Sequence, residues 1–309
     1  MWGWRFLVDE CGFAFRVLEP AVVDNILAQF LDLLEYIRES DGIVMRSEIL
    51  FEIQSVDGRE LHEVLTSADF DRDLRHELFR RLDKIGVYDA NPPGLDIIVD
   101  GRLMHMAPSA ALGLSLTADG RSMACLTTEV AEISGAREVR VYGSELAGIM
   151  HFLVNRSDGP AYWRDLFYSE PDSVVRLASH SHLPFPNTVF AASVWNQLDS
   201  FAGSLRDVWP RLLHNLAGLD DHAVRIWDQD VESDKRQRLM SSIAGVDCSP
   251  ESARTHRNRG AMRQRRVRFG DREIVCEWHA KLEPHRNRVH FAVKDDQVYV
   301  GRFDNHLTT

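Results

Sequence analysis

Apolar residues recur at intervals of three and four along several stretches of the chain, which is the pattern of helices with one buried face. The spacing predicts a helix from Pro20 to Glu39 and a second helix from Asp69 to Ile85. Helical spacing returns between Val194 and Val224, and again from Asp234 to Ile243. The middle of the chain is therefore predicted to be mainly helical.

Short runs rich in β-branched and aromatic residues indicate strands in the first part of the chain. Such runs alternate with Gly and Asp turns between Leu95 and Tyr142, and the stretch from Trp2 to Glu19 is predicted to form a hairpin. We expect the stretch from Ser144 to Asn155 to be helical. Together these elements predict a mixed α/β body at the N-terminus.

The end of the chain alternates apolar and polar residues between turn sequences. This pattern predicts four antiparallel strands, formed by residues 264–269, 272–281, 288–293 and 297–303. The expected fold class is α+β, with a mixed α/β N-terminal body, a helical middle and a C-terminal four-stranded antiparallel sheet. We place the three regions at residues 1–156, 157–244 and 245–309.

Charge is distributed unevenly between these regions. The 309 residues include 36 Lys and Arg and 47 Asp and Glu, a formal net charge of −11. From Val231 to Thr309 there are 16 basic and 11 acidic residues, a net of +5, so the preceding part has 20 basic and 36 acidic residues, a net of −16. Because Lys and Arg bind phosphate and release counterions, the basic segment predicts contact with RNA or another polyanion. The acidic body is a possible docking surface for a protein partner.

Strand alternation predicts which side chains of the basic segment lie together. The outer face of the second and third strands collects Glu277, His279, Lys281, Arg288 and His290. Cleavage of RNA without a metal needs a base, an acid and cations that stabilise the phosphorane charge. Imidazole titrates near neutral pH, so the two histidines are the candidate base and acid, and Glu277 is an alternative base. Lys281 and Arg288 would stabilise the charge.

A group of arginines precedes and enters the predicted sheet. Its members are Arg254, Arg257, Arg259, Arg263, Arg265, Arg266 and Arg268. We expect them to hold the phosphate backbone of a nucleic acid, because arginine contacts to phosphate oxygens position a protein along the strand.

Three stretches of this segment resemble the RelE/HigB superfamily of bacterial toxin ribonucleases. They are His279-Ala-Lys-Leu, Arg288-Val-His-Phe and residues 298–306, which cover about a tenth of the chain. The family is shorter than this chain and offers no equivalent of the acidic N-terminal portion. The resemblance implies cleavage of mRNA, often on the ribosome, in toxin–antitoxin or phage-defence biology. It carries over Lys281, Arg288 and His306 as catalytic candidates.

Other interpretations of the same segment stay open. Neutral imidazoles favour zinc, and His279 and His290 on adjacent strands could reach one ion, but no ligand pair has the spacing of a known zinc motif. The expected site therefore has neither a metal nor a cofactor. A noncatalytic subunit that binds nucleic acid or an acidic protein is the alternative function, and a solvated surface with weak cross-strand ion pairs is the simplest explanation.

Several function classes are disfavoured by absent patterns. The four cysteines lie far apart and never form a C-x-x-C pair, so we expect a reducing, cytoplasmic compartment. The sequence lacks an export signal at its start and any apolar run approaching roughly 18 residues, so no membrane association is expected. Phosphate-binding glycine loops, H-E-x-x-H and G-x-S-x-G are missing, which disfavours nucleotide hydrolases, zincins and α/β-hydrolases.

Overall fold

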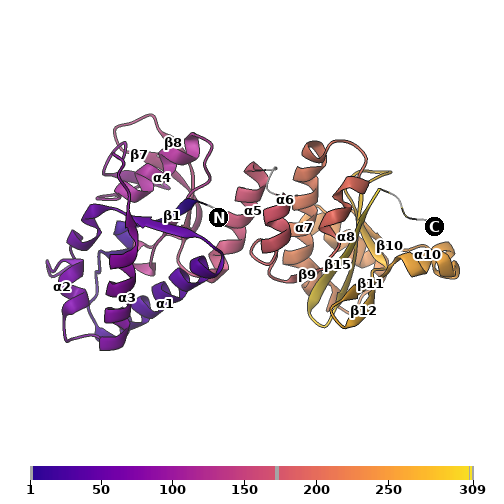
Figure 1. The fold of residues 1–309 in the computed structure, drawn as a ribbon, viewed down its shortest axis with the longest axis horizontal. Helices are drawn as coiled ribbons and strands as arrows, with labels where there is room; N and C mark the ends of the chain where they lie inside the picture. The colour runs from indigo at the N-terminus through magenta and orange to yellow at the C-terminus, as the bar shows by residue number, and fades with distance from the viewer. Residues whose placement is uncertain (1–2, 171–173, 306, 308–309) are drawn as a thin grey trace. The chain divides into compact units, whose positions relative to one another are not determined.

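The computed structural model describes residues 3–170, 174–305 and 307. The chain divides into two compact units, Met1–Asp165 and Leu166–Thr309, and Figure 1 labels many of their helices and strands. Both units combine helices with sheets, which confirms the α+β class. The single division differs from the three regions expected from the sequence, because the helices of the middle region and the C-terminal sheet belong to one unit.

The N-terminal unit contains an eight-stranded sheet with the order β3-β2-β1-β6-β8-β7-β4-β5. The strands are β1 (Trp4–Val8), β2 (Ile43–Arg46), β3 (Gly86–Val87), β4 (Ile97–Val99), β5 (Arg102–Met104), β6 (Ala124–Leu126), β7 (Gly135–Val141) and β8 (Ala147–Leu153). Neighbours from β3 to β8 run parallel, whereas β7, β4 and β5 pair antiparallel. The carboxyl ends of β1, β2, β6 and β8 therefore meet at one edge of the sheet.

Five helices accompany this sheet. They are α1 (Pro20–Glu39), α2 (Leu61–Thr66), α3 (Arg72–Lys84), α4 (Pro108–Ala118) and α5 (Gly159–Ser169), which spans the division between the units. Helix α1 has the predicted bounds, and Pro20 occupies its first turn, where a missing N–H leaves no hydrogen bond unmade. Helix α3 begins later than predicted, because the side chain of Asp71 caps it by accepting from the N–H groups of Asp73 and Leu74.

Two predictions for the N-terminal unit are wrong. The residues expected to form a hairpin supply the single strand β1, which pairs in parallel with β2 and β6. The stretch expected to be helical, Ser144 to Asn155, contains strand β8. The second half of β8 is buried on both faces, so its apolar residues follow one another without alternation. A short continuous apolar run of this kind does not distinguish a buried strand from a helix.

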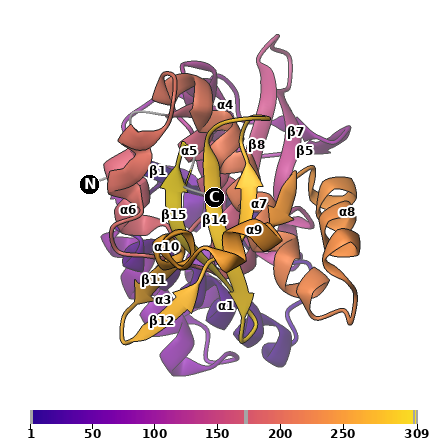
Figure 2. The ribbon, with the colours of Figure 1, turned by 90° about the vertical axis from the view of Figure 1, so that its right-hand side faces the viewer.

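The C-terminal unit contains a five-stranded sheet with the order β10-β13-β14-β15-β9. Its strands are β9 (Thr188–Phe190), β10 (Cys248–Pro250), β13 (Trp278–Lys281), β14 (Arg288–Lys294) and β15 (Gln297–Asp304). Strand β9 runs parallel to β15, and the other pairs are antiparallel. A separate hairpin is formed by β11 (Arg266–Phe269) and β12 (Arg272–Val275). Figure 2 shows these strands with the helices of the unit.

The prediction of a four-stranded meander is therefore wrong in strand number and connection. The run expected to be one strand, 272–281, is broken at Cys276, whose N–H donates to the carbonyl oxygen of Arg265 over 2.8 Å. Its first half stays in the hairpin with β11, whereas its second half joins the main sheet beside β10. Two of the five strands, β9 and β10, come from outside the predicted meander.

Helices α6 (Val174–His180), α7 (Leu205–Trp227), α8 (Ser233–Ala244), α9 (Ala253–Arg257) and α10 (Arg259–Gln264) belong to the C-terminal unit, as bounded by the described residues. Helix α7 packs on one face of the sheet, where the Trp227 ring lies 4.8 Å from that of Trp278 and 5.7 Å from that of Phe291. The opposite face carries the candidate histidines. Within the described ranges, no helix combines the length and the apolar composition that crossing a membrane requires.

Candidate functional site

The pairing of β13 with β14 brings four candidate side chains together. His279 lies directly opposite His290, and Lys281 lies directly opposite Arg288. Because alternate residues of a strand share a face, all four side chains project from the face that does not contact α7. The two imidazole ring centroids are 5.6 Å apart.

The two histidines are buried, although the sequence pattern led us to expect an exposed face. Exposed fractions are 7% for His279 and 0% for His290, so this face is covered at the two histidines, whereas Lys281 and Arg288 on the same face are only half-buried. The cover comes from Glu251, which follows β10, and from Arg265, which follows α10. A substrate in solution therefore cannot contact the side chain of His290 in this structure.

Glu251 and Arg265 form a buried ion pair above the histidines. Arg265 Nε lies 2.8 Å from Glu251 Oε1, and Arg265 Nη2 donates to Oε2 over 3.0 Å. Burial raises the pKa of Glu251, but the His279 imidazole and the Arg265 guanidinium outweigh that effect and lower the pKa to about 2. Glu251 is therefore ionised at neutral pH. The exposed role expected for Arg265, contact with a phosphate backbone, is not available to a side chain in this position.

Two ring nitrogens of the cluster face the Glu251 carboxylate without hydrogen bonds. His279 Nδ1 and His290 Nδ1 each lie 3.6 Å from Glu251 Oε1, and both nitrogens are buried and lack a hydrogen-bond partner among the described residues, whereas Glu251 Oε1 is held by the ion pair with Arg265 Nε. The other nitrogen of His279, Nε2, lies 3.1 Å from the hydroxyl of the half-buried Ser249. Burial and the neighbouring imidazole of His279 lower the pKa of His290 to about 3, so its imidazole is neutral at pH 7.

Cationic groups lie at the end of the two strands. Lys281 Nζ lies 3.1 Å from Asp247 Oδ1, and Arg288 is half-buried with an Nε that has no hydrogen-bond partner in the described part of the chain. On the neighbouring strand β15, Arg302 lies directly opposite His290 in the strand register, so it belongs to the same face of the sheet. Glu277 is exposed and immediately precedes β13, and its carbonyl accepts a hydrogen bond from the Glu251 N–H. The candidate His306 lies outside the described residues.

The remaining arginines lie on a surface next to this cluster. Arg254, Arg257, Arg259, Arg263, Arg266 and Arg268 are all exposed on α9, α10 and β11. The surface is joined to the sheet by Arg302, whose Nη1 donates to the carbonyl oxygen of Gln264 over 3.5 Å. We call these six residues the arginine surface.

Sequence reasoning missed Glu251, Ser249 and Arg302. Ser249 and Glu251 are brought to the site by β10, a three-residue strand that carries no repeating pattern of its own. Their approach to His279 depends on pairing between β10 and β13, which are separated by the whole β11–β12 hairpin. Arg302 stands in the sequence as a charged residue in an otherwise largely apolar strand, a signal that could have marked it.

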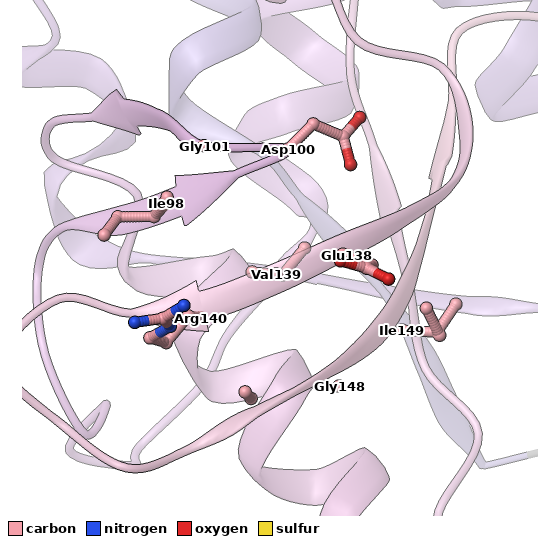
Figure 3. Close-up of a pocket in the computed structure, with 9 residues that line it drawn as sticks. Ile98, Asp100, Gly101, Glu138, Val139, Arg140, Gly148 and Ile149 are labelled. Atoms are coloured by element: carbon pink, nitrogen blue, oxygen red, sulfur yellow. The ribbon is translucent and has the colours of Figure 1, made fainter.

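A pocket in the N-terminal unit lies on β4, β7 and β8, as shown in Figure 3. Its volume is about 400 Å³, and its charged lining residues are Asp100, Glu138 and Arg140. Neither histidine nor cysteine lines it, so it offers no side chain that ordinarily titrates near neutral pH. This pocket therefore contributes no candidate group for proton transfer.

Comparisons with protein-family models, with curated proteins and with solved structures found no match to this chain. The functional argument consequently rests on the residues and their geometry.

Proposed function

We propose that the C-terminal unit binds RNA through the arginine surface and cleaves it at the neighbouring face of β13 and β14. The observation that carries this proposal is the composition of the residues from Ser252 to Gly270, which include seven arginines and no Asp or Glu. Arg254, Arg259 and Arg263 form no ion pair within the described chain. Arg265 is neutralised by Glu251 and Arg266 pairs with Glu273, so the exposed arginines without an ion pair are the ones available to a phosphate backbone.

Lys281 and Arg288 supply the electrostatic part of the proposed reaction. They face each other across one register position, next to the imidazoles, and a pair of cations there stabilises negative charge that develops on a phosphoryl group. His279 is the imidazole connected to the half-buried Ser249 hydroxyl, so it is the candidate group for proton transfer. The resemblance to the RelE/HigB superfamily extends the proposal to a bacterial-type effector that acts on mRNA.

A second candidate function is binding of RNA or another polyanion without cleavage. It is favoured by the burial of both imidazoles and by the low pKa of His290, because a neutral, enclosed imidazole does not act as a proton donor at pH 7. In this alternative the arginine surface keeps its role, and Lys281 and Arg288 only add to the basic surface.

Cleavage is tested with purified full-length chain and end-labelled single-stranded RNA. We expect Lys281→Ala and Arg288→Ala to lower the cleavage rate by about 10²-fold each, since they remove charge stabilisation in the transition state. Lys294→Ala removes an exposed cation from β14, the strand that carries Arg288, and serves as the matched control. Unchanged cleavage in both site variants would place the active site elsewhere. RNA binding without cleavage by the wild-type chain would support the noncatalytic alternative.

Binding is tested through its salt dependence. We expect Arg259→Gln and Arg263→Gln each to weaken RNA binding and to reduce the slope of log K against log [salt] by about 1, because each arginine is assigned to one phosphate. Lys235→Gln changes an exposed cation on α8 and should leave both quantities unchanged. Fluorescence anisotropy between low and physiological salt gives both values. An equal effect of all three substitutions would indicate dependence on net charge alone.

A further inference from the structure

The feature of the C-terminal unit that calls for a ligand is the group of three facing atoms described above. The Nδ1 atoms of His279 and His290 are buried, lie 3.6 Å from Glu251 Oε1 and make no hydrogen bond among the described residues, and Glu251 Oε1 itself has only the ion-pair contact with Arg265 Nε among them. A buried polar atom left without a partner costs about 1–3 kcal/mol. Two such nitrogens on either side of one carboxylate oxygen indicate that a missing group joins all three atoms.

Their spacing fits a metal ion. A carboxylate oxygen of Glu251 and one ring nitrogen from each histidine lie within 4.8 Å of one another. Bonds from zinc to nitrogen or oxygen are about 2.0–2.2 Å, and a tetrahedral arrangement then separates neighbouring ligand atoms by about 3.4 Å. The two observed distances from Glu251 Oε1 to the histidine nitrogens, both 3.6 Å, are close to that value.

Neighbouring groups hold two of the three side chains in the orientation a metal requires. Ser249 Oγ lies 3.1 Å from His279 Nε2, so a hydrogen bond on that nitrogen leaves Nδ1 directed toward Glu251. Arg265 Nη2 binds Glu251 Oε2 and fixes the carboxylate. In metal sites the ligand atoms that do not bind the metal, such as the second ring nitrogen of a histidine, are typically hydrogen-bonded. These bonds fix the orientation of the ring and its tautomer.

The charge of the site narrows the kind of metal. The three candidate ligands carry one negative charge, on Glu251, and the neighbouring Arg265 neutralises it. This is unfavourable for Mg²⁺ or Ca²⁺, because these ions are bound by several anionic oxygens. Zinc is bound by neutral imidazoles, and three histidines alone hold it in carbonic anhydrase. Two imidazoles and one carboxylate are a known catalytic zinc set, with the fourth position open.

We propose that Glu251, His279 and His290 bind one zinc ion per chain. This inference goes beyond the proposed ribonuclease function and does not depend on it. An ion at this place would occupy His279, so any cleavage at the site would then depend on the metal.

The test is titration of the chelator-treated, full-length chain with Zn²⁺ by isothermal titration calorimetry, together with melting curves at each zinc concentration. We expect one ion per chain and a melting temperature that rises with zinc, because a ligand that binds only the folded chain stabilises it. Replacing a ligand in Glu251→Gln, His279→Gln or His290→Gln should weaken binding by at least about 100-fold. Ser249→Ala, which removes only the orienting contact, should weaken it by about 10- to 100-fold.

His285→Gln provides the control, because His285 is exposed in the loop between β13 and β14. The zinc affinity of the His285→Gln chain should equal that of the wild-type chain. Failure of the wild-type chain to bind zinc would overturn the proposal whatever the variants do. Equal zinc binding in the wild-type chain and in a folded Glu251, His279 or His290 variant would overturn it too. Neither outcome depends on whether the chain cleaves RNA.

Discussion

Replacing Arg265 with methionine should lower the free energy of unfolding of the C-terminal unit by about 3–5 kcal/mol. The substitution leaves the Glu251 carboxylate buried without its cation, and breaking one side of a buried ion pair has a cost of this size. Arg265 also donates through Nη1 to the carbonyl of Ala261 over 2.8 Å, so the end of α10 loses a contact as well. Urea unfolding followed by tryptophan fluorescence, with chelator present, measures the change.

The double variant Glu251→Leu/Arg265→Met separates a lost charge partner from lost packing. Removing both charges should recover most of the loss, because a buried ion pair replaced by apolar side chains is often neutral or stabilising. Arg266→Met is the matched control, since Arg266 is the exposed neighbour and pairs with the exposed Glu273. A double variant as unstable as Arg265→Met would show that shape, rather than unpaired charge, determines the effect.

The second large effect concerns Asp9 and Glu10, which follow β1 at the carboxyl edge of the N-terminal sheet. Both carboxyl groups are fully buried. Thr127 Oγ1 donates to Asp9 over 2.7 Å, and Glu10 accepts from the Ser109 hydroxyl over 2.6 Å and from Ser47. Burial raises the pKa of Asp9 from 3.8 to about 6, and burial together with the nearby Asp9 charge raises the pKa of Glu10 from 4.5 to about 7.

We therefore expect the N-terminal unit to lose stability as the pH rises from about 4.5 to about 7. A raised pKa means that the folded state holds its proton more tightly than the unfolded state, so the contribution is complete below the unfolded pKa and is lost as the pH passes the folded one. A shift of this size corresponds to about 3 kcal/mol for Glu10. Calorimetric unfolding of the full chain across this pH range measures it.

Glu10→Gln removes the proton that titrates and should flatten that pH dependence. Glu129→Gln changes an exposed carboxylate in the same unit and should leave the pH dependence as in the wild-type chain. A Glu10→Gln variant that keeps the full slope between these pH values would assign the titration to other groups.

The sequence predicted the parts of this fold that local periodicity determines. Helix α1 was predicted at both ends, because its apolar stripe is regular and Pro20 marks its start. Alternation along β13 and β14 also placed His279 and His290 on one face, and the register that sets them opposite each other came from the structure. Strand β8 was mistaken for a helix, since burial on both faces removes the alternation that identifies a strand.

The candidate site could be predicted only in part, for a related reason. Its two histidines belong to adjacent strands, so a short-range pattern brought them together. Glu251 and Arg265 reach them only through tertiary packing, and neither residue is marked by spacing relative to the histidines. The sequence likewise gave no sign that the face would be covered, because Arg265 looks like any other member of its arginine-rich stretch.

The parallel pairing of β9 with β15 limits how the chain can be shortened. A fragment that begins at Val231 would lack β9 and α7, so β15 would be left as an open edge and the apolar face that contacts Trp227 would be bared to water. Such a fragment is expected to aggregate through that edge. A fragment intended to isolate the basic sheet should therefore retain everything from Leu166 onward.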